Sequence, residues 1–274
     1  MNKKMNKISL YIGIILLIIL WLLPIVFVVI TSTKTNMEFY TTPVFSFPET
    51  FCWENFKKAF ITSKLYIYMR NSLLICLIKV PIGLLVESLT AFALTRLKIK
   101  HSKAIFIFIL IGMMIPLQAL LLPINIVVGK LNMTNSLLTL ALIYLGIQLP
   151  FGVLVFRGFM KSIPMEIDES ARIDGCSNLR LYWNIILPIA KPAVATMIIL
   201  DSLYTWNEFL FSSLINTQTN VRTVPAGILV FYGETVVDYP KLCAGILILI
   251  IPILIVYLIF QRYFVEGVSG AVKG

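Results

Sequence analysis

The chain has 274 residues, of which 59% are hydrophobic and 13% are charged, and its formal net charge is +10. Soluble globular chains are usually about half apolar and about a quarter charged, so this composition excludes an ordinary soluble domain and favours a single membrane-embedded bundle. The cations lie in short segments between apolar runs, a distribution typical of membrane orientation and not of nucleic-acid binding.

Cysteine and histidine usage excludes several kinds of site. Cys52, Cys76, Cys176 and Cys243 are far apart in the chain, which gives neither a disulfide framework nor a zinc motif. His101 is the only histidine, which argues against a histidine-based metal site or a serine–histidine hydrolase. We therefore expect no metal, no cofactor and no catalytic residue.

The first apolar run covers residues 8–30 and has no charge over 23 residues. It is longer than the roughly 7–15 residues of a signal-peptide core and long enough to cross a membrane, so we expect a retained first helix. Spans in lipid must satisfy their own backbone hydrogen bonds, and no segment alternates with period two, so we expect an all-α polytopic protein with six transmembrane helices. The other five predicted spans are 71–94, 104–128, 137–156, 193–215 and 242–261.

The positions of the basic residues predict the orientation. With both termini in the cytoplasm, cytoplasmic segments hold fourteen Lys and Arg residues and external segments hold eight. This bias agrees with the positive-inside rule, and it predicts an N-in, C-in topology. The first external loop, residues 31–70, is rich in proline and aromatic residues, which favours an interfacial or packed cap over a disordered linker.

The longest cytoplasmic stretch, residues 158–191, predicts two short helices that meet at a glycine turn. Ser162 is the predicted N-cap of the first helix and Pro164 lies near its first turn. Asp174 and Gly175 are expected to end this helix, with glycine in the left-handed conformation. The acidic residues that favour its first turn are Glu166, Asp168 and Glu169.

A second short helix is predicted to begin at Ser177 or Asn178, to continue to Ile186 and to end before Pro188. The chain has no GxxxxGK phosphate-binding loop, so it does not hydrolyse ATP by the usual P-loop route. If ATP drives a process here, the work must come from another subunit, and a compact helix pair can transmit force where a flexible loop cannot.

The same stretch carries a longer motif. Glu169-Ser170-Ala171-Arg172-Ile173-Asp174-Gly175, followed after nine residues by Ile185-Ile186-Leu187-Pro188, resembles the EAA loop of ABC importer permeases, with Ser170 in place of the middle alanine. The resemblance implies that this helix docks into a cleft on an ATP-binding subunit, where Ala171 permits close approach, Glu169 makes polar contacts and Gly175 permits the turn. The alternative is an ordinary amphipathic cytoplasmic hairpin. The implied ATPase-coupling residues are Glu169, Ser170, Ala171, Asp174, Gly175, Leu187 and Pro188.

Further stretches resemble the smaller, six-helix permease of maltose-type carbohydrate importers. They are Arg70-Asn71-Ser72, Ala91-Phe92-Ala93-Leu94-Thr95-Arg96, Ile115-Pro116 to Leu122-Pro123, and the ending from Gln261 to Gly274. The resemblance implies a type I ABC importer permease fold in one domain, residues 1–274, with a cytoplasmic tail over 262–274 that reaches the ATPase dimer. By itself a glycine-rich terminus is more often a frayed end. The implied tail contacts are Gly270, Ala271, Val272, Lys273 and Gly274.

The resemblance also implies the partners and the setting. They are a second homologous permease, two ATP-binding subunits, an extracellular sugar-binding protein, a sugar (an oligosaccharide by family resemblance) and the lipid of a bacterial plasma membrane, with no nucleic acid. The chain itself would be a non-catalytic subunit. Two rival hypotheses are an ABC importer permease for a non-sugar solute and a secondary transporter driven by an ion gradient; a membrane scaffold would leave the charged residues within the spans without a purpose.

Polar side chains within the spans are the candidate substrate pathway. Charged residues at mid-membrane are unfavourable by about 2.5–3.5 kcal/mol on insertion scales. Lys79 and Glu87 lie two turns apart on one helical face, where a structural ion pair with another helix or with the partner permease is the alternative to function. The fifth span offers aromatic and hydrogen-bonding groups suited to sugars, although subunit packing or gate closure would also explain them. The pathway candidates are Asp201, Trp206, Asn207 and Glu208.

Overall fold

In the computed structural model, which describes residues 2–231 and 237–272, the regular elements are helices. This confirms the all-α prediction. Within the described ranges, four helices are long and apolar enough to cross a membrane, and two bent pairs raise the number to six if each pair counts as one span. The four long helices are α1 (Asn2–Ser32), α4 (Leu65–Arg96), α7 (Leu137–Ser162) and α14 (Tyr239–Val272). In the first bent pair, α5 (Ser102–Ile111) and η2 (Gly112–Met114) form one half and α6 (Leu117–Lys130) forms the other. In the second pair, the first half consists of α9 (Asn178–Leu181), η3 (Tyr182–Ile186) and α10 (Leu187–Ile189), and the second half consists of α11 (Lys191–Asn207) and α12 (Leu210–Ile215).

The chain divides into two compact units. The first comprises Met1–Tyr66 and Ile228–Ile251, and the second comprises Ile67–Gly227 and Pro252–Gly274. The first unit contains α1, the short helices α2 (Asn36–Thr41), α3 (Glu54–Lys57), η1 (Lys58–Thr62) and η4 (Ile228–Phe231), and the start of α14. The second holds α4 to α13 (Val224–Gly227), apart from the first two residues of α4. The single-domain expectation stays a prediction.

In the first unit, the predicted external loop is packed around a buried lysine. The Lys34 ammonium donates hydrogen bonds to Thr42 Oγ1 at 3.0 Å, the Pro43 carbonyl at 2.9 Å and Ser46 Oγ at 3.0 Å. Thr35 and Glu38 form a capping box that starts α2. The backbone N–H of Thr35, with that of residue 49, holds the pKa of the Glu38 carboxyl below its usual value.

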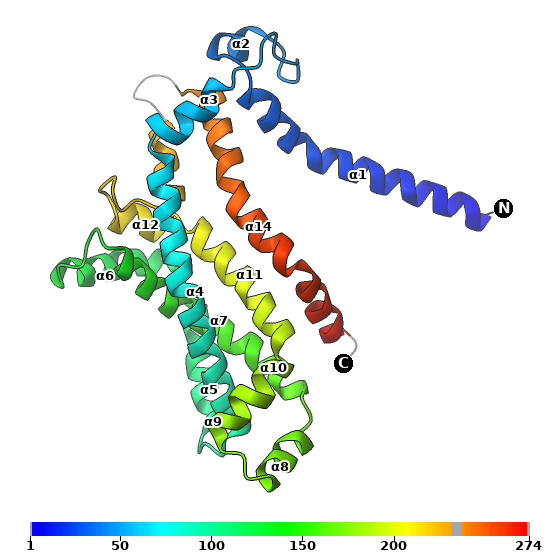
Figure 1. The fold of residues 1–274 in the computed structure, drawn as a ribbon, viewed down its shortest axis with the longest axis vertical. Coiled ribbons are helices and arrows are strands. Elements are labelled where there is room, and N and C mark those ends of the chain that lie inside the picture. Colours follow the sequence, from blue (N-terminus) through cyan, green and yellow to red (C-terminus); the bar gives the residue numbers. More distant parts are fainter. Residues whose placement is uncertain (1, 232–236, 273–274) are drawn as a thin grey trace. The chain divides into compact units, whose positions relative to one another are not determined.

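In the second unit, α4, α7 and α11 carry two apolar clusters, and α5 contacts α7 (Figure 1). One cluster joins the last turns of α4 and α7 to α8 (Glu166–Ile173), η3 and the first half of α11. The other joins the first half of α4 to α6, the start of α7 and α12. Three buried charged side chains, Lys79, Glu87 and Asp201, come from the stretches of α4 and α11 that lie between the two clusters in sequence.

The third predicted span, 104–128, is not one continuous helix. It breaks before Pro116, and the two halves are bent by 94°. Proline has no backbone N–H and disfavours a helical residue before it, and Ile115 is accordingly extended (φ −82°, ψ 120°). The predicted fifth span, 193–215, is interrupted at Glu208, which is also extended (φ −69°, ψ 118°).

Candidate functional site: the predicted coupling loop and the buried charged residues

The first helix of the predicted coupling loop is α8, and it begins at Glu166. Ser162 does not cap it, contrary to the prediction, because α7 continues through Ser162 and its hydroxyl donates to the Phe159 carbonyl at 2.7 Å. The chain turns at Ile163 before Pro164, as the restriction on the residue preceding proline requires. The predicted acidic first turn is confirmed, with Glu166, Asp168 and Glu169 in place.

Gly175 ends α8 as predicted, in the left-handed conformation with φ +77°. The Cys176 N–H donates to the Ala171 carbonyl at 2.9 Å and the Gly175 N–H donates to the Arg172 carbonyl at 3.0 Å. This pair of bonds is a Schellman motif, which favours glycine at its left-handed position. Ser177, one of the two predicted starts, caps α9 by accepting from the Arg180 N–H at 3.4 Å.

The second helix of the loop is longer than predicted. It passes from α9 through the π-helical turn η3 into α10, so Pro188 lies within the helical stretch and not after it. The chain bends at Ala190, where the axis changes direction by 77°. Of the two predicted coupling residues here, Leu187 is half-buried and Pro188 is exposed.

Arg96, the last residue of α4, ties α8 to two other helices. Its Nη2 donates to the Met160 carbonyl at 2.5 Å and to the Ile163 carbonyl at 2.8 Å, both at the end of α7. Its Nη1 lies 3.3 Å from Asp168 Oδ1 on α8, and both side chains are almost fully buried. One guanidinium therefore fixes the direction in which α8 leaves the bundle.

Apolar packing on the inner face of α8 completes its attachment to the bundle. Ala171 is buried against the cluster that includes Phe92, Phe156 and Tyr182. It therefore faces the core of its own chain, where its small side chain permits close packing of α8 on the bundle. The close approach to an ATP-binding subunit that the resemblance implies stays a prediction. The Tyr182 and Ser88 hydroxyls lie 2.7 Å apart and join η3 to α4.

The outer surface of the loop combines charged and apolar side chains. Of the predicted coupling residues on α8 and at its end, Glu169, Ser170, Asp174 and Gly175 are exposed. Beside them in sequence, Ile173, Leu179 and Trp183 are exposed by 86%, 67% and 50%. Exposed apolar side chains of this size, in a segment whose inner face is fixed to the rest of the chain, are typical of a protein-binding surface. These three residues were not among the predicted coupling residues, and their exposure is visible only in the folded structure.

The predicted tail contacts lie at the edge of the described residues. The backbone of Gly270, Ala271 and Val272 is part of α14, and Lys273 and Gly274 lie outside the described residues. The helix therefore extends beyond the predicted end of the sixth span at residue 261.

Within the spans, Asp201 is held by an ion pair. Lys79 Nζ on α4 lies 2.7 Å from Asp201 Oδ2 on α11, and both side chains are fully buried. This is the structural ion pair that the sequence left as the alternative for Lys79. Glu87, two turns further along α4, is also fully buried.

The remaining pathway candidates surround the break between α11 and α12. Glu208 accepts a hydrogen bond from the Tyr144 hydroxyl at 2.6 Å and caps α12 by accepting from the Phe211 N–H at 2.9 Å and the Ser212 N–H at 3.1 Å. Trp206 is buried, and Asn207 is exposed with its amide bonded to the Leu203 carbonyl. No glycine or proline lies near this break, so the sequence carries no signal for it.

Comparison with known proteins identifies the fold and the family. Residues 79–270 match the family described as binding-protein-dependent transport system inner membrane component. The chain is 36% identical over 265 residues to the probable starch degradation products transport system permease protein AmyC of Thermoanaerobacterium thermosulfurigenes, covering 96% of this chain and 95% of that one. It is 31% identical over 277 residues to the trehalose/maltose transport system permease protein MalG of Thermococcus litoralis, covering 100% and 99%.

A solved structure shares the architecture. A chain of a bacterial ABC transporter involved in the import of the acidic polysaccharide alginate superposes with a TM-score of 0.80 at 20% identity, over 94% of this chain and 97% of that chain. This likeness shows the fold of an ABC importer permease. Together with the family match and the two full-length relatives, it establishes that the chain belongs to the binding-protein-dependent transport system inner membrane component family, the permease subunits of ABC transporters.

Proposed function

We propose that this chain is the transmembrane permease subunit of an ATP-driven, binding-protein-dependent carbohydrate importer. It forms the translocation pathway with a second homologous permease, receives its substrate from an external sugar-binding protein and is driven by two ATP-binding subunits. The chain itself is non-catalytic. Two full-length relatives that are named for the transport of starch degradation products and of trehalose and maltose support the substrate class.

The observation that carries the coupling role is the rigid attachment of α8. Its inner face is fixed by the Arg96–Asp168 ion pair and by buried Ala171, while Glu169, Ser170, Asp174 and Gly175 stay exposed. A segment held this way moves as one body with α4 and α7. Rotation of a nucleotide-binding subunit docked on it would therefore be transmitted to the spans as a rigid-body movement.

The substrate pathway is proposed along α11 and the break that follows it. Among the candidates, Asn207 is the side chain that stays exposed. Asp201 and Glu208 are engaged within the chain, so they support the pathway by holding α4, α7, α11 and α12 in register. The tail from Gly270 to Gly274 is proposed as a further contact with the ATP-binding subunits.

The test is uptake by the complete transporter in proteoliposomes with its external binding protein. The sugars are maltose, trehalose, a set of neutral starch oligosaccharides and an oligosaccharide of uronic acids. We expect uptake of a carbohydrate that stops on ATP depletion and survives the collapse of ion gradients by ionophores. Uptake that follows the ion gradient and ignores ATP would contradict the proposal, as would the absence of uptake for every carbohydrate.

A further inference from the structure

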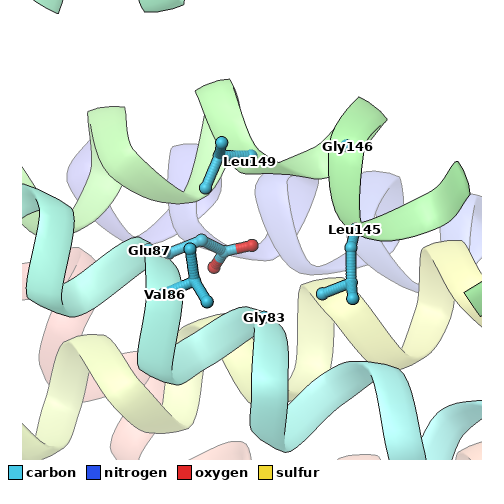
Figure 2. A pocket seen from close by; sticks show the side chains of 6 residues that line it. All are labelled: Gly83, Val86, Glu87, Leu145, Gly146 and Leu149. Atoms are coloured by element: carbon cyan, nitrogen blue, oxygen red, sulfur yellow. The ribbon is translucent and has the colours of Figure 1, made fainter. Parts of the chain in front are cut away.

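The buried charged residues Lys79, Glu87 and Asp201, here called the charged layer, lie beside a pocket between α4 and α7 within the second unit. Figure 2 shows Val86 and Glu87 of α4 on one side and Leu145 and Leu149 of α7 on the other. Gly83 and Gly146 complete the lining, and the volume is about 240 Å³. Since a water molecule occupies about 30 Å³ in the liquid, the pocket has room for much more than a bridging water.

Among the described residues, Glu87 is the only ionisable side chain that lines this pocket, and its carboxyl group has no hydrogen-bond partner there. It is fully buried, and neither of its carboxyl oxygens has a hydrogen-bond partner among the described residues. Lys79, the nearby cation, is 2.7 Å from Asp201 and is held there. A buried carboxyl group without a hydrogen bond is unfavourable by several kcal/mol at membrane depth, so a hydrogen-bond donor that enters the pocket would stabilise it.

Glycines shape the room around this carboxyl group. A Cβ atom at Gly152 would overlap the Glu87 side chain, so glycine there permits Glu87 to sit against α7. A Cβ at Gly83 would lie 3.2 Å from Asp201 Oδ2 and 3.4 Å from Glu87 Oε1, which places both carboxyl groups next to that glycine. At Gly146, in contrast, a Cβ would meet nothing within 4 Å, because this glycine faces the open part of the pocket.

The charges of the layer define the class of the missing group. The Lys79–Asp201 pair is neutral as a whole, and Glu87 adds either no charge or one negative charge. None of the described residues that line the pocket is a cation, and Lys79 is paired with Asp201, so the site offers no positive charge to an anion. Val86, Leu145 and Leu149 offer apolar walls, while the carboxyl group can hydrogen-bond two neighbouring hydroxyl groups, and these are the two kinds of contact that a sugar ring presents.

We propose that the Glu87 pocket binds one ring of a neutral carbohydrate during translocation, with the Glu87 carboxyl group hydrogen-bonded to its hydroxyl groups. This inference rests on the proposed function and adds to it. It assigns a sugar contact to this chain, on α4 and α7 and away from the α11 candidates, and it excludes acidic sugars from that contact.

The experiment compares two glycines in the complete transporter. Gly146→Leu places a side chain in the pocket, and Gly129→Leu on α6 is the matched control, since a Cβ at Gly129 also meets nothing within 4 Å. We measure uptake of the neutral sugar that the wild type takes up in the experiment above. We expect Gly146→Leu to lower uptake about tenfold, as loss of one good polar contact and its space predicts, and Gly129→Leu to leave it unchanged.

Variants of Glu87 distinguish the effect of the hydrogen bond to the sugar from the effect of the space in the pocket. Glu87→Leu should lower uptake about as much as Gly146→Leu, and Glu87→Gln, which keeps hydrogen-bonding capacity, should keep most of it. Both variants should retain the second permease and the ATP-binding subunits on purification. Wild-type uptake in both Gly146→Leu and Glu87→Leu would overturn the inference and leave the proposed function standing. If Gly146→Leu loses the second permease on purification, a helix of that partner occupies the pocket, and the inference is overturned as well. It is also overturned if the wild-type transporter takes up acidic sugars and no neutral ones.

Discussion

Arg96 makes contacts with two other helices through one buried guanidinium group. It satisfies two carbonyls at the end of α7 and pairs with the buried Asp168 carboxylate of α8. Arginine suits this position because its planar group offers several donors in a fixed fork, which a lysine ammonium cannot reproduce. The residue closes α4 within the stretch Ala91–Arg96 that the resemblance singled out, yet its role became visible only from the geometry.

We predict that Arg96→Met uncouples the transporter. Removal of one partner leaves a buried carboxylate uncompensated, a change that destabilises by about 3–5 kcal/mol, and α8 should loosen from the bundle. The measurements are hydrogen exchange of residues 163–176 and ATP hydrolysis stimulated by the binding protein. We expect faster exchange and lost stimulation.

The double variant Arg96→Met/Asp168→Leu is the control for this prediction. It removes both charges, so it should restore part of the protection of α8, because replacing a buried pair by apolar groups is often close to neutral. Equal exchange in the wild type and in Arg96→Met would show that the packing of Ala171 alone holds α8.

At the scale of elements, the sequence was sufficient where backbone chemistry leaves one solution. Gly175 with Asp174 predicted the end of α8, and Ser177 predicted a start of α9, because a left-handed turn and a helix cap require those residue types. Ser162 misled for the same reason: it has the chemistry of an N-cap, but the apolar face of α7 continues through Met160 and keeps it helical.

Of the two breaks within the spans, one could be predicted from residue type and the other could not. Pro116 marks the break between η2 and α6, and the residue type alone could have predicted it. Glu208 marks the break between α11 and α12, and there the signal is tertiary, because the Tyr144 hydroxyl and two backbone N–H groups hold its carboxyl group. The Lys79–Asp201 pair was likewise beyond the sequence, which placed both residues in spans but could not pair them.

The turn after α8 is the element on which a coupling prediction can be tested most sharply. Gly175→Val forces a β-branched residue into the left-handed region, which is unfavourable by roughly 1–2 kcal/mol or more, and should reorient α9 relative to α8. We expect the variant to remain in the membrane but to lose co-purification of its ATP-binding subunits.

Gly175→Asn is the matched control, since asparagine tolerates the left-handed conformation and nothing lies within 4 Å of the added Cβ. It should co-purify with the ATP-binding subunits as the wild type does. If Gly175→Val also retains them and their stimulated hydrolysis, the turn has no part in coupling. Glu169→Lys, a charge reversal on the exposed face, should lose the same partners without any change in the turn.

At the scale of the whole molecule, the proposed function requires that the coupling loop and the external cap lie on opposite sides of the membrane. The distribution of basic residues predicts this, with 158–191 in the cytoplasm and 31–70 outside. Two native cysteines report on the two segments, because Cys52 lies in the first external loop and Cys176 follows the Gly175 turn, and both are partly exposed.

A membrane-impermeant maleimide should therefore label Cys52 in intact, right-side-out vesicles and Cys176 only in inverted ones. Cys76→Ser and Cys243→Ser remove the cysteines within the spans, and detergent-solubilised protein sets the full reactivity of each remaining thiol. Labelling of Cys176 from the outside would place α8 on the side opposite to the nucleotide. Because the Arg96–Asp168 contact fixes α8 to α4 and α7, such a result would reverse the direction of every span in the second unit. It would contradict both the N-in, C-in topology predicted from the basic residues and the coupling role of α8.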